Sequence, residues 1–437
     1  MDTLIQVAQL ILALTILVFI HELGHFLAAR MFGIRVDKFY IFFDAWGKKI
    51  WSFKRGGTEY GIGWLPLGGY VKIAGMIDES MDTKQMSSEP QPWEFRSKPN
   101  WQKFIVMIAG IVMNIILGII LFILYLNHYE KYYTDVKSVN DNGGIYATEY
   151  GKSQEVGLQT GDKLIAVNGK EYTRLFDYAS QRVYFGAELT IERNGKEIVI
   201  DVPNDAFKKL MLGDKLFDTR STVVIDSFNT KLANAKNAGF QQKDKIIQVN
   251  GDSVICFAQL TEMLKNHKGD SVNVMVERNG ASLNIPVLVD TSGQIGFIPG
   301  ITVYPYDSIK YTVGKSLAFG FRDAYEIFYF QAIGVWKIIT GQIPAKDSVQ
   351  SPIGITKYFS PTWIWAGFWR MTALLSMVLA FMNLLPIPAL DGGHILFIGI
   401  ETVTRKKLSD KFLERAQVVG MVLLLSLMVF AVFNDIF

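Results

Sequence analysis

Long apolar runs dominate the pattern of this 437-residue chain. A helix needs about 20 mostly apolar residues to cross a bilayer, and four stretches approach that length with no charge inside them: 4–20, 104–126, 371–390 and 418–433. The first continues as a helical pattern through Ala29 and begins beside Asp2 instead of a basic cluster, so we predict a retained span and no cleaved signal peptide. A fifth run, 316–339, contains four charged residues, which favours an amphipathic helix on a membrane surface.

The distribution of basic residues predicts the orientation of these spans. Residues 30–103 carry twelve Lys and Arg against eight acidic residues, and residues 404–415 carry five against two. The long segment 128–315 carries 22 basic and 23 acidic residues. Because Lys and Arg concentrate in the cytoplasmic loops of membrane proteins, we expect the first two segments inside the cell and the long segment outside.

The long outer segment contains an internal repeat. Residues 157–169 align with residues 239–251, 82 positions later, and the tetrapeptide 192–195 recurs at 277–280. Each copy places Asn-Gly between apolar runs, which is a hairpin signal. We therefore predict two copies of one β-rich module, and their pattern resembles bacterial tandem PDZ domains, which bind an extended peptide as an added strand. The alternative is a pair of modules that only space or shield another part of the protein.

Composition excludes several functional classes. The net charge is only +3 and no basic run reaches five residues, so nucleic-acid binding is not expected. Cys256 is the one cysteine in the sequence, which excludes an internal disulfide framework and multi-thiolate metal sites. Any metal site must therefore use carboxylates and the five His residues.

The sequence His21-Glu22-Leu-Gly-His25 lies in the first predicted span. Residues i and i+4 share one helix face, so both imidazoles can bind one ion, and Glu22 can reach a water on that ion. Five His and 41 acidic residues shuffled at random would form this motif roughly 0.005 times. The alternative, polar residues with ordinary hydrogen bonds in a helix bundle, is disfavoured because ionisable groups inside a membrane are costly and typical of functional sites.

Two His residues leave the site incomplete, because catalytic zinc takes three protein ligands and a water. Between Glu22 and residue 58 the only acids are Asp37 and Asp44, in an irregular loop. Asp391 is the better candidate, since it follows a span broken by two prolines, and an acid is tolerated there where it lines a buried or wet cavity. The predicted topology brings this end of the third span and His25 to the same cytoplasmic depth.

These motifs resemble the site-2 protease family of intramembrane zinc proteases, in its bacterial regulator of sigma-E protease branch with four spans and two PDZ domains. The resemblance implies that His21, His25 and Asp391 bind Zn²⁺ and that Glu22 is the catalytic acid and base. It also implies that Asn383 holds the substrate strand near the metal. His394 could add a fourth ligand, but we favour a supporting role, since a fourth protein ligand would close the water position.

Residues 63–72 resemble the membrane-dipping β-hairpin of that family, whose edge pairs with an unwound substrate. Gly69, Tyr70 and Val71 are the candidate substrate-binding residues in it. The mixture of glycines and β-forming residues independently indicates an exposed edge, and the alternative is an ordinary amphipathic hairpin. The chain departs from the family at 109–114, which lacks the proline of Ala-Gly-Pro-x-x-Asn, and at 42–44, where Phe-Phe-Asp replaces Gly-Phe-Gly; we expect neither segment to touch a ligand.

The expected fold is an α-helical polytopic membrane protein with four transmembrane helices, two β-rich PDZ-like domains and a membrane-dipping β-hairpin. The expected parts are a first transmembrane helix with the zinc motif (1–32), a membrane-associated hairpin region (33–100), a second transmembrane helix (101–127), two PDZ-like domains (128–215 and 216–303), an amphipathic connecting region (304–362), a third transmembrane helix (363–390), the Asp-Gly motif with a cytoplasmic loop (391–415) and a fourth transmembrane helix (416–437).

The expected function is hydrolysis of peptide bonds within or near the transmembrane segments of single-span proteins in a bacterial inner membrane. The active site would face the cytoplasm and the PDZ-like domains the periplasm. Family analogy suggests anti-sigma factors and remnant signal peptides as substrates, in a stress response, and peptides at the PDZ-like domains. The alternatives are a membrane-anchored PDZ scaffold with a non-catalytic metal site and, less well supported, a zinc transporter.

Overall fold

A computed structural model describes residues 2–65, 68–76, 89–148, 153, 156–203, 216–229, 232–300, 308–344, 346 and 350–436. The chain divides into two compact units, which are described separately below. The first comprises Met1–Lys131 with Tyr311–Phe437, and the second comprises Tyr132–Lys310.

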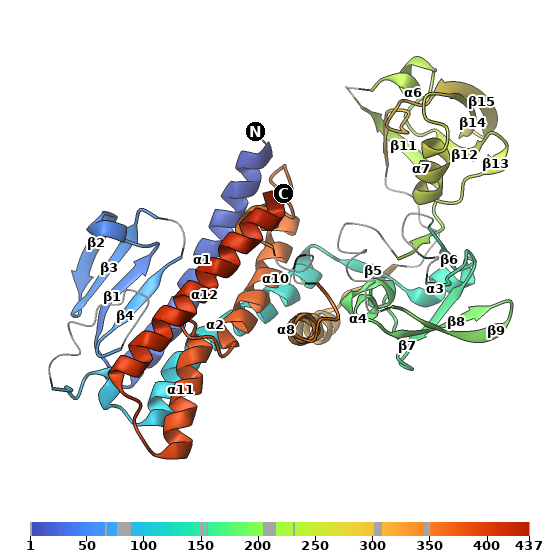
Figure 1. Cartoon of the computed structure of the whole chain (residues 1–437). Helices are drawn as coiled ribbons and strands as arrows, with labels where there is room; N and C mark the ends of the chain where they lie inside the picture. The colour runs from blue at the N-terminus through green and yellow to red at the C-terminus, as the bar shows by residue number, and fades with distance from the viewer. Residues whose placement is uncertain are drawn as a thin grey trace. The chain divides into compact units, whose positions relative to one another are not determined.

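Four helices of the first unit are long and apolar enough to cross a membrane, as the sequence predicted. They are α1 (Asp2–Met31), α2 (Asn100–His128), α10 (Trp365–Leu384) and α12 (Asp410–Ile436) (Figure 1). Helix α2 packs against both α1 and α10. Glycine permits the close approach of α1 and α2, because a Cβ on Gly24 would lie 2.9 Å from the Cα of Gly110.

The third span is shorter than predicted. Helix α10 ends at Leu384, because Pro386 and Pro388 cannot continue a helix. After a turn in which Ala389 adopts a φ of 81°, a new helix, α11 (Asp391–Thr404), begins at the predicted ligand. The segment expected as a loop from residue 391 therefore starts with a 14-residue helix.

Helix α8 (Val313–Ile339) covers the fifth apolar run. Ala324 is buried against side chains of α2 and α10, and Phe328 meets Phe381 of α10 edge to face at 5.4 Å. The helix also exposes large apolar side chains, among them Leu317 and Phe321. It is followed by the short α9 (Pro352–Thr356).

A four-stranded sheet follows α1 and packs beside it (Figure 1). Its strands are β1 (Val36–Ile41), β2 (Lys49–Arg55), β3 (Thr58–Gly63) and β4 (Tyr70–Ile73), in the order β2-β3-β1-β4. A short 3₁₀ helix, η1 (Ala45–Gly47), connects β1 to β2, and another, η3 (Phe95–Ser97), precedes α2. The expected hairpin over 63–72 is wrong in one respect: β3 and β4 do not pair with each other, because β1 lies between them, parallel to β3 and antiparallel to β4. The hairpin of this sheet is β2–β3, and β4 is an edge strand.

The second unit contains two modules. The first holds β5 (Tyr132–Thr134), α3 (Val136–Asp141), β6 (Ile145–Tyr146), β7 (Lys163–Val167), η4 (Leu175–Ala179), α4 (Gln181–Tyr184), β8 (Glu188–Arg193) and β9 (Lys196–Asp201). The second holds β10 (Asp218–Thr219), β11 (Val223–Phe228), α6 (Asn234–Asn237), β12 (Lys245–Val249), β13 (Asp252–Ser253), α7 (Phe257–Lys265), β14 (Ser271–Arg278), β15 (Ala281–Leu288) and β16 (Phe297–Pro299). Strand β17 (Ser308–Lys310) returns to pair with β5, and β10 pairs with β6.

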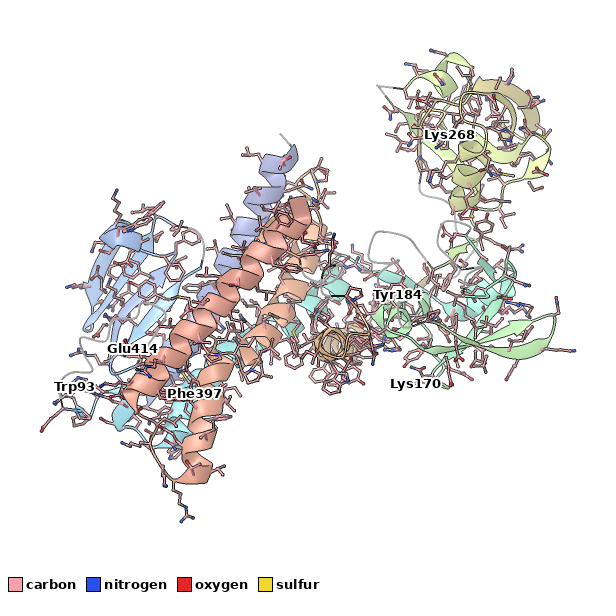
Figure 2. All side chains as sticks on the ribbon, viewed as in Figure 1. Trp93, Lys170, Tyr184, Lys268, Phe397 and Glu414 are labelled. Atoms are coloured by element: carbon pink, nitrogen blue, oxygen red, sulfur yellow. The ribbon has the colours of Figure 1, made fainter. Side chains whose placement is uncertain are left out.

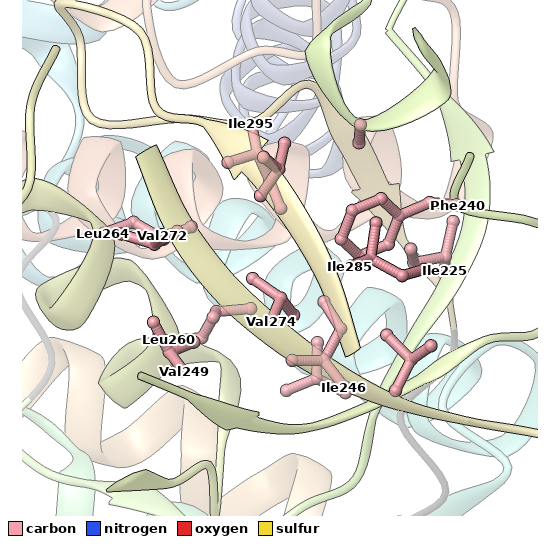
Figure 3. Packing of buried hydrophobic residues seen from close by; sticks show 14 of the residues in the cluster. Ile225, Phe240, Ile246, Val249, Leu260, Leu264, Val272, Val274, Ile285 and Ile295 are labelled. Carbon is pink, nitrogen blue, oxygen red and sulfur yellow. The ribbon is translucent and has the colours of Figure 1, made fainter. Parts of the chain in front are cut away.

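The sequence repeat corresponds to repeated contacts in the two modules. Arg193 donates to both carboxylate oxygens of the buried Asp162 at 2.7 Å, and Arg278 does the same to Asp244. The Asn-Gly hairpins predicted at 194–195 and 279–280 connect β8 to β9 and β14 to β15. Each module has its own apolar core, and Figure 3 shows that of the second.

Candidate metal centre

Helix α1 directs the two predicted His ligands to one place. His21 and His25 lie one turn apart on the same face, as their spacing requires, and both are buried. Their Nε2 atoms are 3.2 Å apart. The glycine at 110 on α2 makes room for them, because a Cβ there would overlap Nε2 of His25.

Asp391 joins this pair from a part of the chain 370 residues after His21. Its Oδ2 lies 3.1 Å from Nε2 of His21 and 3.2 Å from Nε2 of His25. The two glycines that follow allow this placement, since a Cβ on Gly393 would lie 2.6 Å from the carbonyl oxygen of Ile387 and one on Gly392 would overlap the Leu385 carbonyl. The ligand atoms of the three residues all lie within 4.8 Å of one another.

The chemistry of these atoms fits a cation. Nδ1 of His25 is 2.8 Å from the carbonyl oxygen of Val106, which can only accept, so Nδ1 carries the proton and Nε2 carries a lone pair. That lone pair faces Oδ2 of Asp391, a buried oxygen that receives no hydrogen bond. Two neutral imidazoles and one carboxylate form the donor set of a catalytic Zn²⁺ site, which leaves one position for water or substrate.

Two asparagines complete the surroundings of His21. The side-chain amide of Asn114, which is fully buried on α2, lies 3.3 Å from Nδ1, and its Oδ1 has no partner. With the amide turned so that Oδ1 faces Nδ1, this oxygen would accept a hydrogen bond from the Nδ1–H of His21 and leave the Nε2 lone pair free for a metal. The amide of Asn383, in the last turn of α10, lies 3.3 Å from Nε2 on the opposite side of the ring.

A cavity of about 70 Å³ opens beside the three ligands. Of the predicted site residues, Glu22, Tyr70, Val71 and His394 line it. Gly69 is not among the lining residues; a Cβ at that position would lie 2.5 Å from the carbonyl oxygen of Tyr40. The predicted catalytic residue and part of the predicted substrate strand therefore border one space with the three candidate ligands.

The two nearby acids considered as alternative ligands are engaged elsewhere. Asp37 binds Arg35 at 2.8 Å. Asp44 binds Lys38 at 2.7 Å and accepts a hydrogen bond from the Tyr70 hydroxyl at 2.8 Å. Burial raises the pKa of Asp44, but these two hydrogen bonds outweigh it and the net pKa is lowered.

Sequence reasoning gave no role to Asn114 or Gln417. The expectation that 109–114 would not touch a ligand is wrong, because Asn114 on α2 lies beside Nδ1 of His21. Gln417 lines the cavity, and its side-chain oxygen accepts the backbone N–H of Ala389 at 3.2 Å. A signal for both existed, because a buried amide in an apolar helix needs a partner. The partner could not be inferred, since it lies in a different helix or turn.

Comparison with known proteins places the chain among membrane-associated peptidases of one family. The family model described as "Peptidase family M50" matches residues 9–427. "Regulator of sigma-E protease RseP" of Escherichia coli is 27% identical, with 98% of each chain covered. "Regulator of sigma E protease" of Haemophilus influenzae is 28% identical, with 100% of this chain and 99% of the relative covered. "Zinc metalloprotease RasP" of Geobacillus kaustophilus is 28% identical, with 100% and 98% covered.

The fold and the candidate site define a polytopic membrane protein with a two-His, one-carboxylate centre between its helices. The chain belongs to peptidase family M50, the site-2 protease family. The resemblance inferred from its motifs is thereby confirmed, and the chain is a zinc metalloprotease by family.

Proposed function

We propose that this chain is an intramembrane zinc metalloprotease that hydrolyses peptide bonds in or near the membrane-spanning segment of single-span proteins. The observation that carries the proposal is the meeting of His21, His25 and Asp391, within 4.8 Å, between helices of membrane-spanning length. Zn²⁺ held by these residues would act as a Lewis acid on a water molecule and on the scissile carbonyl.

In this proposal, side chains of the protein carry out the proton transfer and position the substrate. Glu22 takes the proton of the attacking water and delivers it to the leaving amine, which its place in the lining of the cavity supports. Asn383, whose amide lies beside Nε2 of His21, orients the substrate backbone near the ligands. His25 would present its Nε2 lone pair to the ion, because its Nδ1 donates to the carbonyl oxygen of Val106.

The substrate would enter as an extended strand. A helix hides its carbonyls in internal hydrogen bonds, so a transmembrane helix has to unwind before it can be cut. Pairing with β4 would replace those bonds. This role of β4 is supported by its position at the edge of the sheet and by Tyr70, Val71 and Ile73, which line the cavity. In this proposal the sheet dips into the membrane from the cytoplasmic side.

The second unit would select substrates outside the membrane. We assign its two repeated modules, over residues 128–215 and 216–303, as PDZ-like domains in the periplasm that bind or sieve peptides. The amphipathic region 304–362 would connect them to the third span. Because relatives are named for regulation of sigma-E, the proposed substrates in a bacterial inner membrane are anti-sigma factors and remnant signal peptides.

The test is cleavage of a single-span substrate by the purified protein in lipid vesicles. Cleavage should require bound zinc, stop on treatment with a chelator and return on addition of Zn²⁺. A protein that binds one zinc per chain but leaves every single-span substrate intact would contradict the proposal and favour the scaffold alternative.

A further inference from the structure

A second, larger cavity adjoins the candidate metal centre. Its volume is about 240 Å³, and it shares Met76, His394 and Gln417 with the smaller cavity beside the ligands. Its walls come from the segments that flank residues 77–88, from the first turn of α2, from α11 and from the start of α12. All of these belong to the first unit.

The cavity follows one face of α11. The residues of this helix that line it are His394, Phe397, Ile398 and Glu401, and Figure 2 labels Phe397. They recur every three or four positions from Asp391 and so lie on one side of the helix. Ten residues of helix span about 15 Å, and an extended chain advances about 3.3 Å per residue. The length from the metal ligand to Glu401 therefore fits about four residues of extended peptide.

Strand β4 points toward this cavity. Tyr70 and Val71 line the smaller cavity, and Met76, three residues beyond the end of the strand, lines both cavities. Among the described residues, β1 is the only strand that pairs with β4, so its other edge is available. A substrate paired there and continued in a straight line would pass the metal ligands and enter the larger cavity.

Lys103 places a positive charge in the wall of this cavity. Its side chain is only 9% exposed, and its Nζ is 3.9 Å from Oε2 of Glu401, beyond hydrogen-bond distance. Glu401 instead accepts the backbone N–H of Leu408 at 2.9 Å. The neighbouring cation Arg96, in contrast, has a carboxylate oxygen of Glu94 at 2.6 Å. Within the described part of the chain, the Lys103 ammonium therefore makes no hydrogen bond.

We propose that the larger cavity binds the substrate chain on one side of the scissile bond and that Lys103 recognises an acidic side chain about four residues from it. This inference rests on the proposed proteolytic function. A largely buried lysine whose ammonium makes no hydrogen bond within the described residues is costly, and a carboxylate would supply charge-assisted hydrogen bonds. The cavity accepts one such charge, because Arg96, Lys103 and Lys407 line it against Glu401 and Asp410.

The test uses the full-length enzyme in lipid vesicles with a single-span substrate of mapped cleavage site. Glu is placed in turn at positions two to six on each side of the scissile bond, with Gln at the same positions as neutral controls. At one position near the fourth, Glu should raise kcat/KM about ten- to a hundredfold over Gln. The change should lie mainly in KM, because the contact is the same before and during reaction.

Charge reversal at residue 103 provides the matched control. Lys103→Glu should invert the preference, so that Lys at that substrate position is cut better than Glu. Lys406→Glu makes the same charge change on an exposed residue that does not line the cavity, and it should keep the preference for Glu. If Lys103→Glu fails to fold beside Glu401, the double variant Lys103→Met/Glu401→Gln should fold and cut the Glu and Gln substrates equally.

The outcomes separate this inference from the function on which it rests. Equal cleavage of all Glu and Gln pairs by the unmodified enzyme would overturn the inference and leave proteolysis intact. No cleavage of any substrate by the zinc-loaded enzyme would contradict the proposed function itself. Replacing Lys103 could instead lower cleavage only in vesicles with anionic lipid, and equally for the Glu and Gln substrates. That result would assign the cavity to a lipid headgroup and overturn the proposal.

Discussion

The side-chain amide oxygen of Gln417 on α12 accepts the backbone N–H of Ala389 at 3.2 Å. Ala389 lies two residues before Asp391 and has a φ of 81°, a left-handed conformation that costs a residue with a side chain about 1–2 kcal/mol. Gly420, one turn further along α12, has no room for a Cβ against the carbonyl of Pro388. Helix α12 therefore holds the strained turn from which Asp391 reaches the two His residues.

The Gln417→Leu variant should release zinc about tenfold faster than the wild type, because the turn before Asp391 loses its hydrogen bond to this side chain and relaxes. Transfer of zinc from the purified protein to a coloured chelator measures this rate. Adding Ala389→Gly should restore slow release, since glycine adopts the left-handed conformation without the steric cost.

The matched control for this prediction is Gln9→Leu. Gln9 is also a buried amide of a membrane helix, and its Nε2 donates to the carbonyl of Ser360 at 2.8 Å, away from the ligands. Equal rates of zinc release from the Gln417 and Gln9 variants would show that the Gln417 bond does not position Asp391.

Much of the helical framework could be predicted because it depends on local properties. Apolar length alone defines α1, α2 and α12, and the two prolines at 386 and 388 account for the break before α11. The one-turn spacing of His21 and His25 follows from helix periodicity. The Asn-Gly hairpins of the second unit follow from the backbone conformations that Asn and Gly tolerate.

The remaining features depend on which distant segments meet. The order β2-β3-β1-β4 includes a parallel pair, β1 and β3, that no turn signal specifies, so a hairpin was expected where β1 intervenes. Asn114 and Gln417 stand out as amides in apolar helices, but their partners, His21 and Ala389, come from other elements. The local sequence pattern therefore identifies a buried amide of this kind, but it does not determine which distant residue the amide contacts.

Glu22→Gln and Asp391→Ala should separate catalysis from metal binding. Glu22→Gln should keep zinc and lose at least about 10²–10⁴-fold in rate, because the proton carrier is removed while the ligands stay. Asp391→Ala should lose zinc along with activity, since two imidazoles supply neither the third bond nor the negative charge. Zinc per chain by elemental analysis, measured beside the cleavage rate, checks both. Full zinc in Asp391→Ala would remove this residue from the ligand set.

Acid should destabilise the four-stranded sheet through Glu59. Hydrogen bonds from Lys49 at 2.6 Å and Tyr40 at 2.7 Å lower the pKa of Glu59 to about 2. A carboxyl with a lowered folded-state pKa stabilises the fold above its unfolded pKa of about 4.3, and that contribution is lost as the pH falls toward 2. In detergent, wild type should unfold at a higher temperature than Glu59→Gln at pH 6, and the difference between their unfolding temperatures should be smaller at pH 3. An equal difference at both pH values would argue against a stabilising role of the ionised Glu59 carboxylate.

Gly110→Ala should abolish zinc binding although it replaces none of the candidate ligands. The added Cβ would overlap Nε2 of His25 and lie 2.8 Å from Cε1 of His21. The ring of His25 cannot simply turn away, because its Nδ1 is held by the Val106 carbonyl one turn earlier on the same helix as Gly110. We expect loss of zinc and of at least a hundredfold in cleavage rate, with normal membrane insertion. The experiment is elemental analysis and cleavage on protein extracted from membranes.

Gly399→Ala is the control for that substitution. It makes the same change inside α11, where an added Cβ would meet nothing within 4 Å, and alanine there should stabilise the helix by about 0.5–1 kcal/mol. This variant should keep its zinc and its activity. If Gly110→Ala also kept both, the His rings would have to occupy positions other than those beside α2. The lone pair of His25 would then no longer be fixed by Val106, and the pairing of α1 with α2 would not be what shapes the site.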